Sequence, residues 1–309
     1  MKKLLVSILL ATLVMAFAGC GGKSNTSDSG TSVSEEVNVD KLEETPESCF
    51  EWNGTVIFGL TEEGKKLEKI VVPEKCTLTD WGAFSESENL KEVYYKNDNT
   101  ELSPRVFAHS TKLEKVILPN NITVLPEDTF RGCLSLEEIF IPNNVTSIGE
   151  YAFSECSVLK KIEIPSKVEV IGENAFTNCA ALKEFSCPVS LKEIGDNAFL
   201  KCGALEKLEL NEGLERIGSA AFRWCHGLEE VHLPDSLQTL GTEAFAWCNS
   251  LTAIYLPENL ENFDGNLSFT QTGTLSEADH VITVYVKEGS YADVEFENYC
   301  DGYMTKEYY

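Results

Sequence analysis

The sequence predicts a repeat solenoid, in which coils of 23 residues stack to form a parallel β-sheet. Three observations support this fold class. A phenylalanine recurs every 23 residues without insertion, a leucine lies six residues after each of them, and apolar residues alternate nine and eleven residues after them. A constant period in this range is typical of solenoids, because one coil buries its apolar side only against its neighbours. The recurring residues are Phe84, Phe107, Phe130, Phe153, Phe176, Phe199, Phe222 and Phe245.

The coil over 159–182 shows how each element follows from the residues. Ile162 and Ile164 alternate with Glu163 in a short apolar run, which predicts a strand whose two isoleucines point inward. Pro165 ends this strand, because proline has no N–H to give to a sheet.

The rest of the coil returns the chain to the next strand. Gly172 predicts a turn with a positive φ angle, and Phe176 and Cys179 are expected to close the convex side. Sheet spacing would place consecutive Phe rings about 4.8 Å apart, where offset stacking is favourable. A degenerate copy over 67–73 brings the array to about nine strands.

The repeated motif is Leu-x-x-Ile-x-Ile-Pro-x-x-Val-x-x-Ile-Gly-x-x-Ala-Phe-x-x-Cys-x-x-Leu, and it extends from about Leu67 to Phe263. It resembles the BspA-type leucine-rich repeat. The resemblance implies a right-handed coil with a parallel β-sheet on the concave face. Family members are mostly bacterial surface and secreted proteins, and adhesion to host or matrix components is attributed to some. The chain departs from the motif at Lys96, Asn99, Pro126 and Asn211.

The N-terminus predicts an export signal and a lipid site. Residues 1–3 are basic, and residues 4–17 form an apolar run too short to span a bilayer comfortably. The following Phe17-Ala18-Gly19-Cys20 resembles the lipobox of bacterial lipoproteins. This implies acylation of Cys20 and anchoring on the outer side of a bacterial membrane. An ordinary cleaved signal peptide with an incidental cysteine is the alternative.

Composition and pattern divide the chain into five expected segments. These are a signal peptide (1–19), a lipidated flexible linker rich in Ser, Thr and Gly (20–46), an N-terminal cap with the degenerate repeat (47–80), the leucine-rich repeats (81–266) and a small α+β C-terminal cap (267–309). In the last segment we expect a strand at 281–286, a helix that a capping box at Ser290 and Asp293 opens, and a strand at 303–309.

Charge and histidine content exclude several function classes. Fifty acidic against 25 basic residues give a net charge of −25, which repels nucleic acid and anionic membranes. His109, His226, His232 and His280 show neither metal-ligand spacing nor a pattern that joins a nucleophile, a base and an orienting group. The sequence therefore predicts no enzyme, no metal site and no cofactor.

The cysteines follow the repeat. Six of them share one position in consecutive coils, and Ser87 and Ser110 hold that position in the first two coils. A position that accepts serine calls for a small buried side chain, so we expect reduced core thiols rather than disulfides or metal ligands. The six are Cys133, Cys156, Cys179, Cys202, Cys225 and Cys248. The pairing of Cys49, Cys76, Cys187 and Cys300 stays open.

Strand parity predicts the binding surface, because the residue ten positions after each Phe points out of the sheet. The candidate ligand contacts at this position are Tyr94, Ile117, Phe140, His232 and Tyr255. Tyr94, Ile117 and Phe140 lie on adjacent coils, so we expect an exposed apolar patch, which on a soluble surface is typical of an interaction site. The alternative is that a loop or the N-terminal cap covers this patch.

Two further patterns accompany this surface. Acidic and basic residues alternate along the array eight positions after each Phe, and we expect neighbouring strands to pair them. Trp224 and Trp247 share one position in adjacent coils, and we expect them to stack on the convex wall rather than to form an exposed pair.

The sequence thus predicts a monomeric surface lipoprotein whose solenoid binds a protein or a glycan on a host or microbial surface. One alternative is a solute- or cargo-binding lipoprotein that serves a transporter, although a uniform array offers no cleft between two lobes. Another is a structural spacer.

Overall fold

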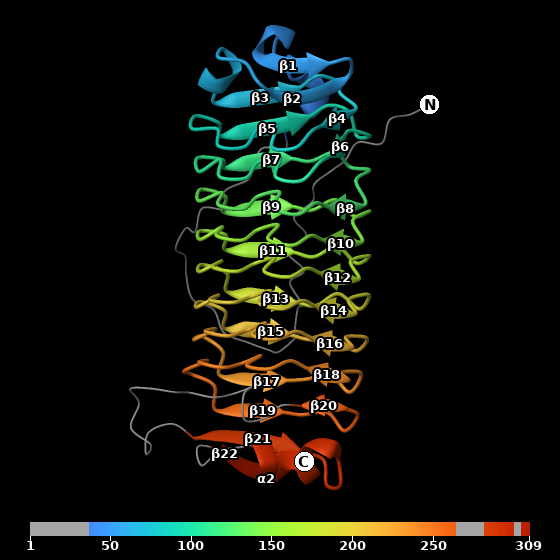
Figure 1. The fold of residues 1–309 in the computed structure, drawn as a ribbon, viewed down its shortest axis with the longest axis vertical. Helices are drawn as coiled ribbons and strands as arrows, with labels where there is room; N and C mark the ends of the chain where they lie inside the picture. The colour runs from blue at the N-terminus through green and yellow to red at the C-terminus, as the bar shows by residue number, and fades with distance from the viewer. Residues whose placement is uncertain (1–36, 264–280, 300–303) are drawn as a thin grey trace, which may run out of the picture. The chain divides into compact units, whose positions relative to one another are not determined.

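The repeats form a parallel β-solenoid with two sheets along its length, as the computed structural model shows (Figure 1). The structure describes residues 37–263, 281–299 and 304–309. Residues 43–309 form one compact unit, and the described part of the separate unit 1–42 contains the 3-10 turn η1 (Val39–Lys41). The predicted signal peptide, Cys20 and most of the linker lie outside the described residues.

The long-strand sheet is the one that the sequence predicts. Its hydrogen-bonded strands pair in parallel with the strand one coil away, in a register of 23 residues that sets Ile139 beside Ile162. The hydrogen-bonded ladder is interrupted at three places along the array. Nine of these strands belong to the predicted repeats, and two strands of the C-terminal cap continue the sheet. The nine are β3 (Lys69–Val72), β5 (Glu92–Tyr95), β7 (Lys115–Ile117), β9 (Glu138–Phe140), β11 (Lys161–Glu163), β13 (Glu184–Ser186), β15 (Lys207–Glu209), β17 (Glu230–His232) and β19 (Ala253–Tyr255).

Two-residue strands form a second parallel column beside the first (Figure 1). Seven of them make one sheet, and the first two belong to a separate sheet at the N-terminal end. The sequence does not predict these strands, because a two-residue strand is too short to show alternation. From β8 to β18, each strand directs its second residue into the core, as with Ile171 after the exposed Val170. The strands are β4 (Leu78–Thr79), β6 (Glu101–Leu102), β8 (Val124–Leu125), β10 (Ser147–Ile148), β12 (Val170–Ile171), β14 (Glu193–Ile194), β16 (Arg216–Ile217), β18 (Thr239–Leu240) and β20 (Asn262–Phe263).

The third side of each coil is a run of turns that carries the predicted column of phenylalanines. From Phe107 to Phe245 the neighbouring rings are stacked, with centroids 5.0–5.4 Å apart and planes within 10°. The Phe N–H of one coil also donates to a carbonyl of the next, as from Phe153 to Ala175 at 2.7 Å. The predicted aromatic stack is confirmed.

The glycine that recurs in each regular coil, such as Gly172 and Gly195, has a different role from the predicted one. Left-handed backbone occurs instead two residues before and after each Phe, for example at Asn174 (φ 56°) and Asn178 (φ 61°). Gly195 is tightly packed against the preceding coil, because a Cβ atom there would lie 2.8 Å from the backbone nitrogen of Glu173. Glycine is therefore required by close approach between coils, and the expectation of a positive φ at Gly172 is wrong.

The cysteine column is buried and consists of free thiols, as predicted. Each thiol donates to the carbonyl oxygen of the Phe in the preceding coil, at 3.1–3.3 Å. Ser110 makes the same hydrogen bond to Phe84 at 2.7 Å, which explains why serine is accepted here. Burial raises the pKa of Cys156 to about 12. Cys49, Cys76 and Cys187 are also free and buried.

An N-terminal hairpin closes one end of the array. Strands β1 (Phe50–Asn53) and β2 (Val56–Leu60) are antiparallel, and β2 pairs in parallel with β4. The 3-10 turns η2 (Glu47–Cys49) and η3 (Gly64–Lys66) flank this hairpin in the sequence. The buried ring of Phe50 lies 6.3 Å from that of Phe84 and so extends the phenylalanine column.

The C-terminal cap contains the elements that the sequence predicts. Strand β21 (Ile282–Val286) pairs with β19, and β22 (Met304–Tyr308) pairs with β21. Helix α2 (Tyr291–Tyr299) begins at a capping box, in which the Asp293 N–H donates to the Ser290 hydroxyl at 3.2 Å. The Asp293 carboxylate accepts from the Gly289 N–H at 2.8 Å.

Candidate binding surface

The outer face of the long-strand sheet is the candidate site, and we define it by the residues that point away from the core. The predicted parity is confirmed in the middle of the array, where Ile162 is buried and Glu163 is exposed. The outward residues ten positions after each Phe are Tyr94, Ile117, Phe140, Glu163, Ser186, Glu209, His232 and Tyr255. Their chemistry divides the face into an N-terminal, a central and a C-terminal part.

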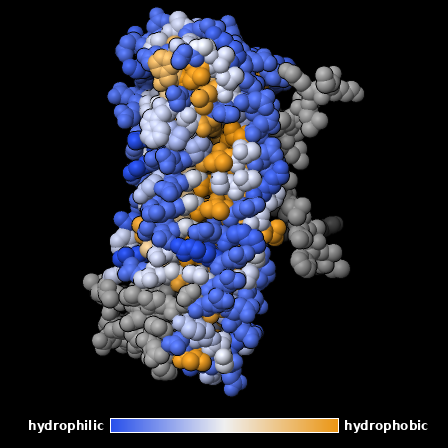
Figure 2. Space-filling view, turned by 45° about the vertical axis from the view of Figure 1, so that its right-hand side comes forward, coloured by the Kyte–Doolittle hydropathy of each residue, from blue (hydrophilic) through white to orange (hydrophobic). Residues whose placement is uncertain are grey.

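The N-terminal part is less open than predicted. Tyr94 is only 2% exposed, its hydroxyl donates to Glu92 at 3.0 Å, and the Lys69 ammonium lies 4.7 Å from its ring centroid. The prediction of an exposed Tyr94 is therefore wrong. Ile117 is half-buried, whereas Phe140 is 40% exposed. In Figure 2, apolar atoms form a band along the upper, N-terminal half of the array between hydrophilic margins.

The central part is a polar groove of about 530 Å³ over β11, β13 and β15. Ion pairs join Lys161 to Glu163 at 2.9 Å and Lys207 to Glu209 at 2.7 Å. The hydrogen bond from Lys207 lowers the pKa of Glu209, and the Ser186 hydroxyl adds to this effect. Each of these lysines forms its ion pair with a carboxylate on its own strand and not with one on a neighbouring strand. The predicted pairing between strands occurs at the N-terminal end, where Lys69 lies 3.5 Å from Glu92 of the next strand.

The C-terminal part is an aromatic row, made of His232, Tyr255, Tyr285 and Tyr309. The rings of His232 and Tyr255 stack at 4.1 Å, and those of Tyr255 and Tyr285 stack at 4.3 Å. Tyr309 meets Tyr255 edge-on at 5.5 Å and donates to the Leu256 carbonyl at 2.8 Å. The structure thus joins the two predicted residues His232 and Tyr255 to two that the sequence analysis did not name.

Tyr285 and Tyr309 lie beyond the point where the 23-residue register ends. Tyr285 pairs with Tyr255 across β21 and β19. The alternation of apolar residues within β21 could have identified Tyr285 as outward-pointing, because it lies between the buried Val284 and Val286. No sequence pattern places Tyr309 here, since it follows β22 and reaches back to β19 through its side chain.

The environment of the row raises the pKa of two of its hydroxyls, those of Tyr255 and Tyr309. Loss of solvent around Tyr255 raises the pKa of its hydroxyl, and the carboxylate of Glu230 adds to the rise. Loss of solvent also raises the pKa of Tyr309, with Asp235 contributing. The His232 ring contacts Glu230 at 2.5 Å. Carboxylates beside the row therefore disfavour ionisation of the Tyr255 and Tyr309 hydroxyls.

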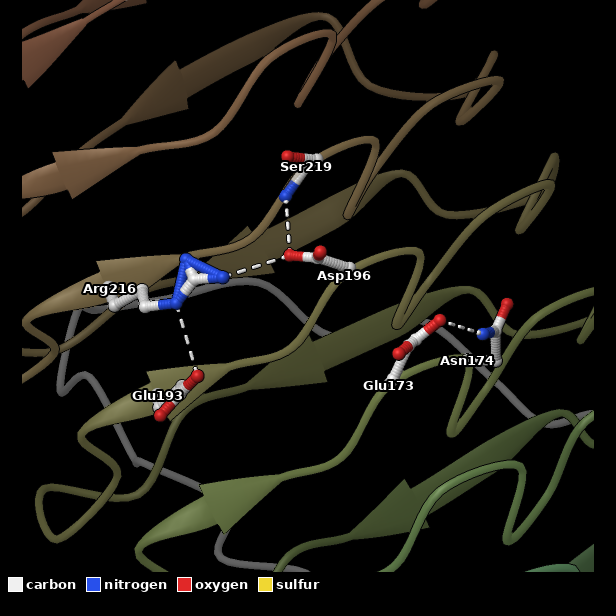
Figure 3. Close-up of polar contacts among 6 residues, drawn as sticks. All are labelled: Glu173, Asn174, Glu193, Asp196, Arg216 and Ser219. Carbon is white, nitrogen blue, oxygen red and sulfur yellow. Dashed lines mark hydrogen bonds and ion pairs between the residues drawn. The ribbon is translucent and has the colours of Figure 1, made fainter.

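The short-strand face is occupied by its own polar contacts. Arg216 donates to Glu193 at 3.1 Å and to Asp196 at 3.0 Å, and the Ser219 N–H donates to Asp196 at 2.9 Å (Figure 3). These contacts link consecutive coils and use the charge of the guanidinium. We therefore place the candidate site on the neighbouring, long-strand face.

The turn side carries the two tryptophans, which do not stack as predicted. The Trp224 ring instead has the Lys201 ammonium and the Arg223 guanidinium each 4.8 Å from its centroid. A ring contact between Trp224 and Trp247 is absent from the described coils. In the same part of the chain, no group of three or more His, Cys, Asp or Glu side chains could hold a metal ion.

Comparison with known proteins gives the family. Residues 62–183 and 146–276 match the BspA type leucine rich repeat region, in six copies, so the chain belongs to this family. A comparison with curated proteins found no match. Within the described residues, no helix has the length and apolar character needed to cross a membrane.

Several solved structures are similar to this chain. A leucine rich repeat protein of T. pallidum is 27% identical, with 60% of this chain and 91% of that chain covered and a TM-score of 0.53. A leucine-rich repeat protein of Bacteroides ovatus is 20% identical, with coverage of 87% and 99% and a TM-score of 0.46. A leucine rich cell surface protein of Faecalibacterium prausnitzii is 22% identical, with coverage of 79% and 89% and a TM-score of 0.45.

Proposed function

We propose that this chain is an exported lipoprotein, anchored through Cys20, whose solenoid binds a protein partner at the bacterial cell surface through the outer face. The observation that carries this proposal is the aromatic row of His232, Tyr255, Tyr285 and Tyr309. Family membership supports a binding scaffold, because repeat proteins of this kind present an extended surface. We propose no catalytic activity.

The stacking of the row favours a protein over a glycan as its ligand. Sugars bind to aromatic side chains mainly through the flat faces of the rings. Here the facing surfaces of His232, Tyr255 and Tyr285 cover one another at 4.1 and 4.3 Å, so the row presents ring edges and hydroxyls instead. Tyrosine is enriched in protein interfaces, since it combines a large apolar area with a hydrogen-bonding tip and few rotatable bonds.

Phe140 and Ile117 extend the same face toward the N-terminus. Phe140 is the exposed aromatic side chain there, and Ile117 lies one coil away, half-buried. The polar groove between this end and the aromatic row has its lysines neutralised by neighbouring glutamates. We propose that the row supplies the binding energy, since aromatic anchors dominate protein interfaces.

The test uses the detergent-solubilised full chain as bait for host matrix and bacterial surface fractions. Tyr255→Glu places a charge in the middle of the row, and Ser186→Glu places the same charge on the same face three coils away. We expect a partner whose affinity falls at least about tenfold with Tyr255→Glu and is retained with Ser186→Glu. The double variant Ile117→Glu with Phe140→Glu measures the contribution of the other end.

The outcome also separates the alternatives. A partner that binds all variants equally would overturn the outer-face proposal. Co-purification with a membrane transporter, independent of Tyr255, would favour a transporter-associated lipoprotein. A chain that reaches the surface and binds neither fraction would be a structural spacer.

A further inference from the structure

A shallow depression of about 290 Å³ lies on the turn side of the solenoid, away from the outer face. Lys201 and Gly203 of one coil and Trp224 and His226 of the next line it. The two residues of each coil occupy the second and fourth positions after the Phe. Gly203 opens the depression, because it contributes no side chain between Lys201 and His226. The volume is at the lower limit of small-molecule sites, about 300 Å³.

Trp224 is held in a conformation that disfavours a bulky side chain. Its φ angle is 63°, in the left-handed region that tolerates glycine and asparagine best. The equivalent position holds Gly132 and Asn178 in earlier coils, with φ angles of 69° and 61°. The same left-handed backbone occurs at this position in every coil, including those that hold Glu155, Lys201 and Trp247. The repeat therefore sets this backbone, and asparagine or glycine fits it with less strain than tryptophan.

The depression concentrates positive charge in a chain whose net charge is −25. The Arg223 guanidinium lies over the Trp224 ring but is paired with Glu243 at 2.5 Å. Lys201 is exposed, and among the described residues no carboxylate lies within ion-pair distance of its ammonium. Its contact is the Trp224 ring, 4.8 Å from the centroid. Lys201 is therefore a cation available to an external anion.

We propose that this depression binds a carboxylate-bearing sugar residue, such as a sialic or uronic acid at the end of a glycan. The indole supplies the apolar wall on which the C–H groups of a sugar ring pack. The flexible side chain of Lys201 lets its ammonium move away from the Trp224 indole and form an ion pair with the carboxylate of the sugar. The His226 ring, exposed at the margin, donates to or accepts from sugar hydroxyls. A phosphate would favour converging backbone N–H groups or an arginine pair, which these four residues do not provide.

The repeat supplies matched controls for the test. Trp224→Asn removes the indole and inserts the residue that Asn178 shows to fit this backbone, so the fold is retained. Trp247→Asn makes the same change one coil away, where φ is also 63° and the side chain does not line this depression. Lys201→Glu reverses the available cation. Lys167→Glu makes the same charge change at an exposed lysine of another coil.

Binding of 3′-sialyllactose and of a galacturonate trisaccharide to the full chain is measured by saturation-transfer NMR, with lactose as the neutral comparison. We expect at least one acidic sugar to bind at least tenfold more tightly than lactose. Trp224→Asn and Lys201→Glu should each weaken that binding at least tenfold, while Trp247→Asn and Lys167→Glu stay within twofold. Thermal melting should place Trp224→Asn at or above the unmodified chain, because asparagine relieves the backbone strain.

Three outcomes would overturn the proposal. The first is that neither acidic sugar binds more tightly than lactose. The second is equal loss of binding with Trp247→Asn and Trp224→Asn. The third is unchanged binding with Lys201→Glu. The proposal stands apart from the outer face, so a variant of Tyr255 should leave sugar binding intact.

Discussion

Replacement of Gly195 by alanine tests whether the repeat glycine is required by close packing. The ideal Cβ atom at this position would lie 2.8 Å from the Glu173 nitrogen, 2.8 Å from the Gly172 carbonyl carbon and 3.1 Å from the Glu173 Cα. All three atoms belong to the backbone of the preceding coil, so no side-chain rotation can relieve the contact. The two coils must move apart by several tenths of an ångström, and this strains the hydrogen bond from the Gly195 N–H to the Ile171 carbonyl at 2.9 Å.

Two opposing effects set the magnitude. Overpacking of this kind costs about 1–3 kcal/mol. Alanine also reduces the entropy of the unfolded chain relative to glycine, which is worth about 0.4–1 kcal/mol. We therefore expect Gly195→Ala to lower the free energy of unfolding by about 1–2 kcal/mol, since the packing cost is the larger. Gly203→Ala is the control, because its Cβ would meet nothing closer than a His226 atom at 3.9 Å, and it should be neutral or slightly stabilising.

Urea unfolding of the full chain, followed by circular dichroism, measures these differences. The Gly195→Asn variant distinguishes the two reasons why glycine could be required here, which are close packing and a positive φ angle. Asparagine tolerates a left-handed backbone, so it would be better than alanine if a positive φ were the requirement. Because the obstruction is at the Cβ atom, we expect asparagine to be at least as destabilising as alanine. A Gly195→Asn variant more stable than Gly195→Ala would refute the close-packing argument.

Three further predictions follow from the core and the N-terminus. Phe176→Leu removes ring stacking at 5.2 and 5.0 Å on its two sides while keeping an apolar residue, and we expect a loss of about 1–3 kcal/mol in unfolding free energy by urea titration. Burial raises the pKa of Cys202 and Cys248 to about 12 and that of Cys179 well above its usual value. The neutral thiols therefore contribute fully to the free energy of unfolding below about pH 8.5, the pKa of an unfolded cysteine. This contribution declines from there to about pH 12, by up to about 1.4 kcal/mol per pH unit for each thiol. Cys179→Ser should make the decline with pH less steep by the contribution of one thiol, about 1.4 kcal/mol per pH unit. Cys20→Ser should move the exported protein from the membrane fraction to the soluble fraction, as measured by fractionation and by labelling with a fatty-acid analogue.

Each of these predictions has an outcome that contradicts it. A change below about 0.5 kcal/mol for Phe176→Leu would show that the stacked rings contribute little beyond burial. Stability that is unchanged from pH 8 to pH 11 would contradict the buried neutral thiols. Retention of Cys20→Ser in the membrane fraction would show that another segment anchors the chain.

Part of the outer face could be predicted and part could not. Strand parity identified His232 and Tyr255 as outward residues, because they lie in regular coils whose neighbours on both sides are buried. The same rule failed at Tyr94, which points outward yet is 2% exposed. Parity gives the direction of a side chain but not what lies over it. Tyr309 could not be predicted at all, since it contacts Leu256 across 53 residues.

The sequence by itself determined the period, the parallel long-strand sheet, the phenylalanine stack and the buried cysteine column. These features repeat six to eight times, and each is set by local alternation or by contact with an equivalent neighbour. Only the tertiary structure decided the second sheet, the packing role of Gly195, the lysine pairs within single strands and the membership of the aromatic row. These depend on the distance between backbones and on the orientation of side chains from different coils, and no periodicity in a single chain encodes either quantity.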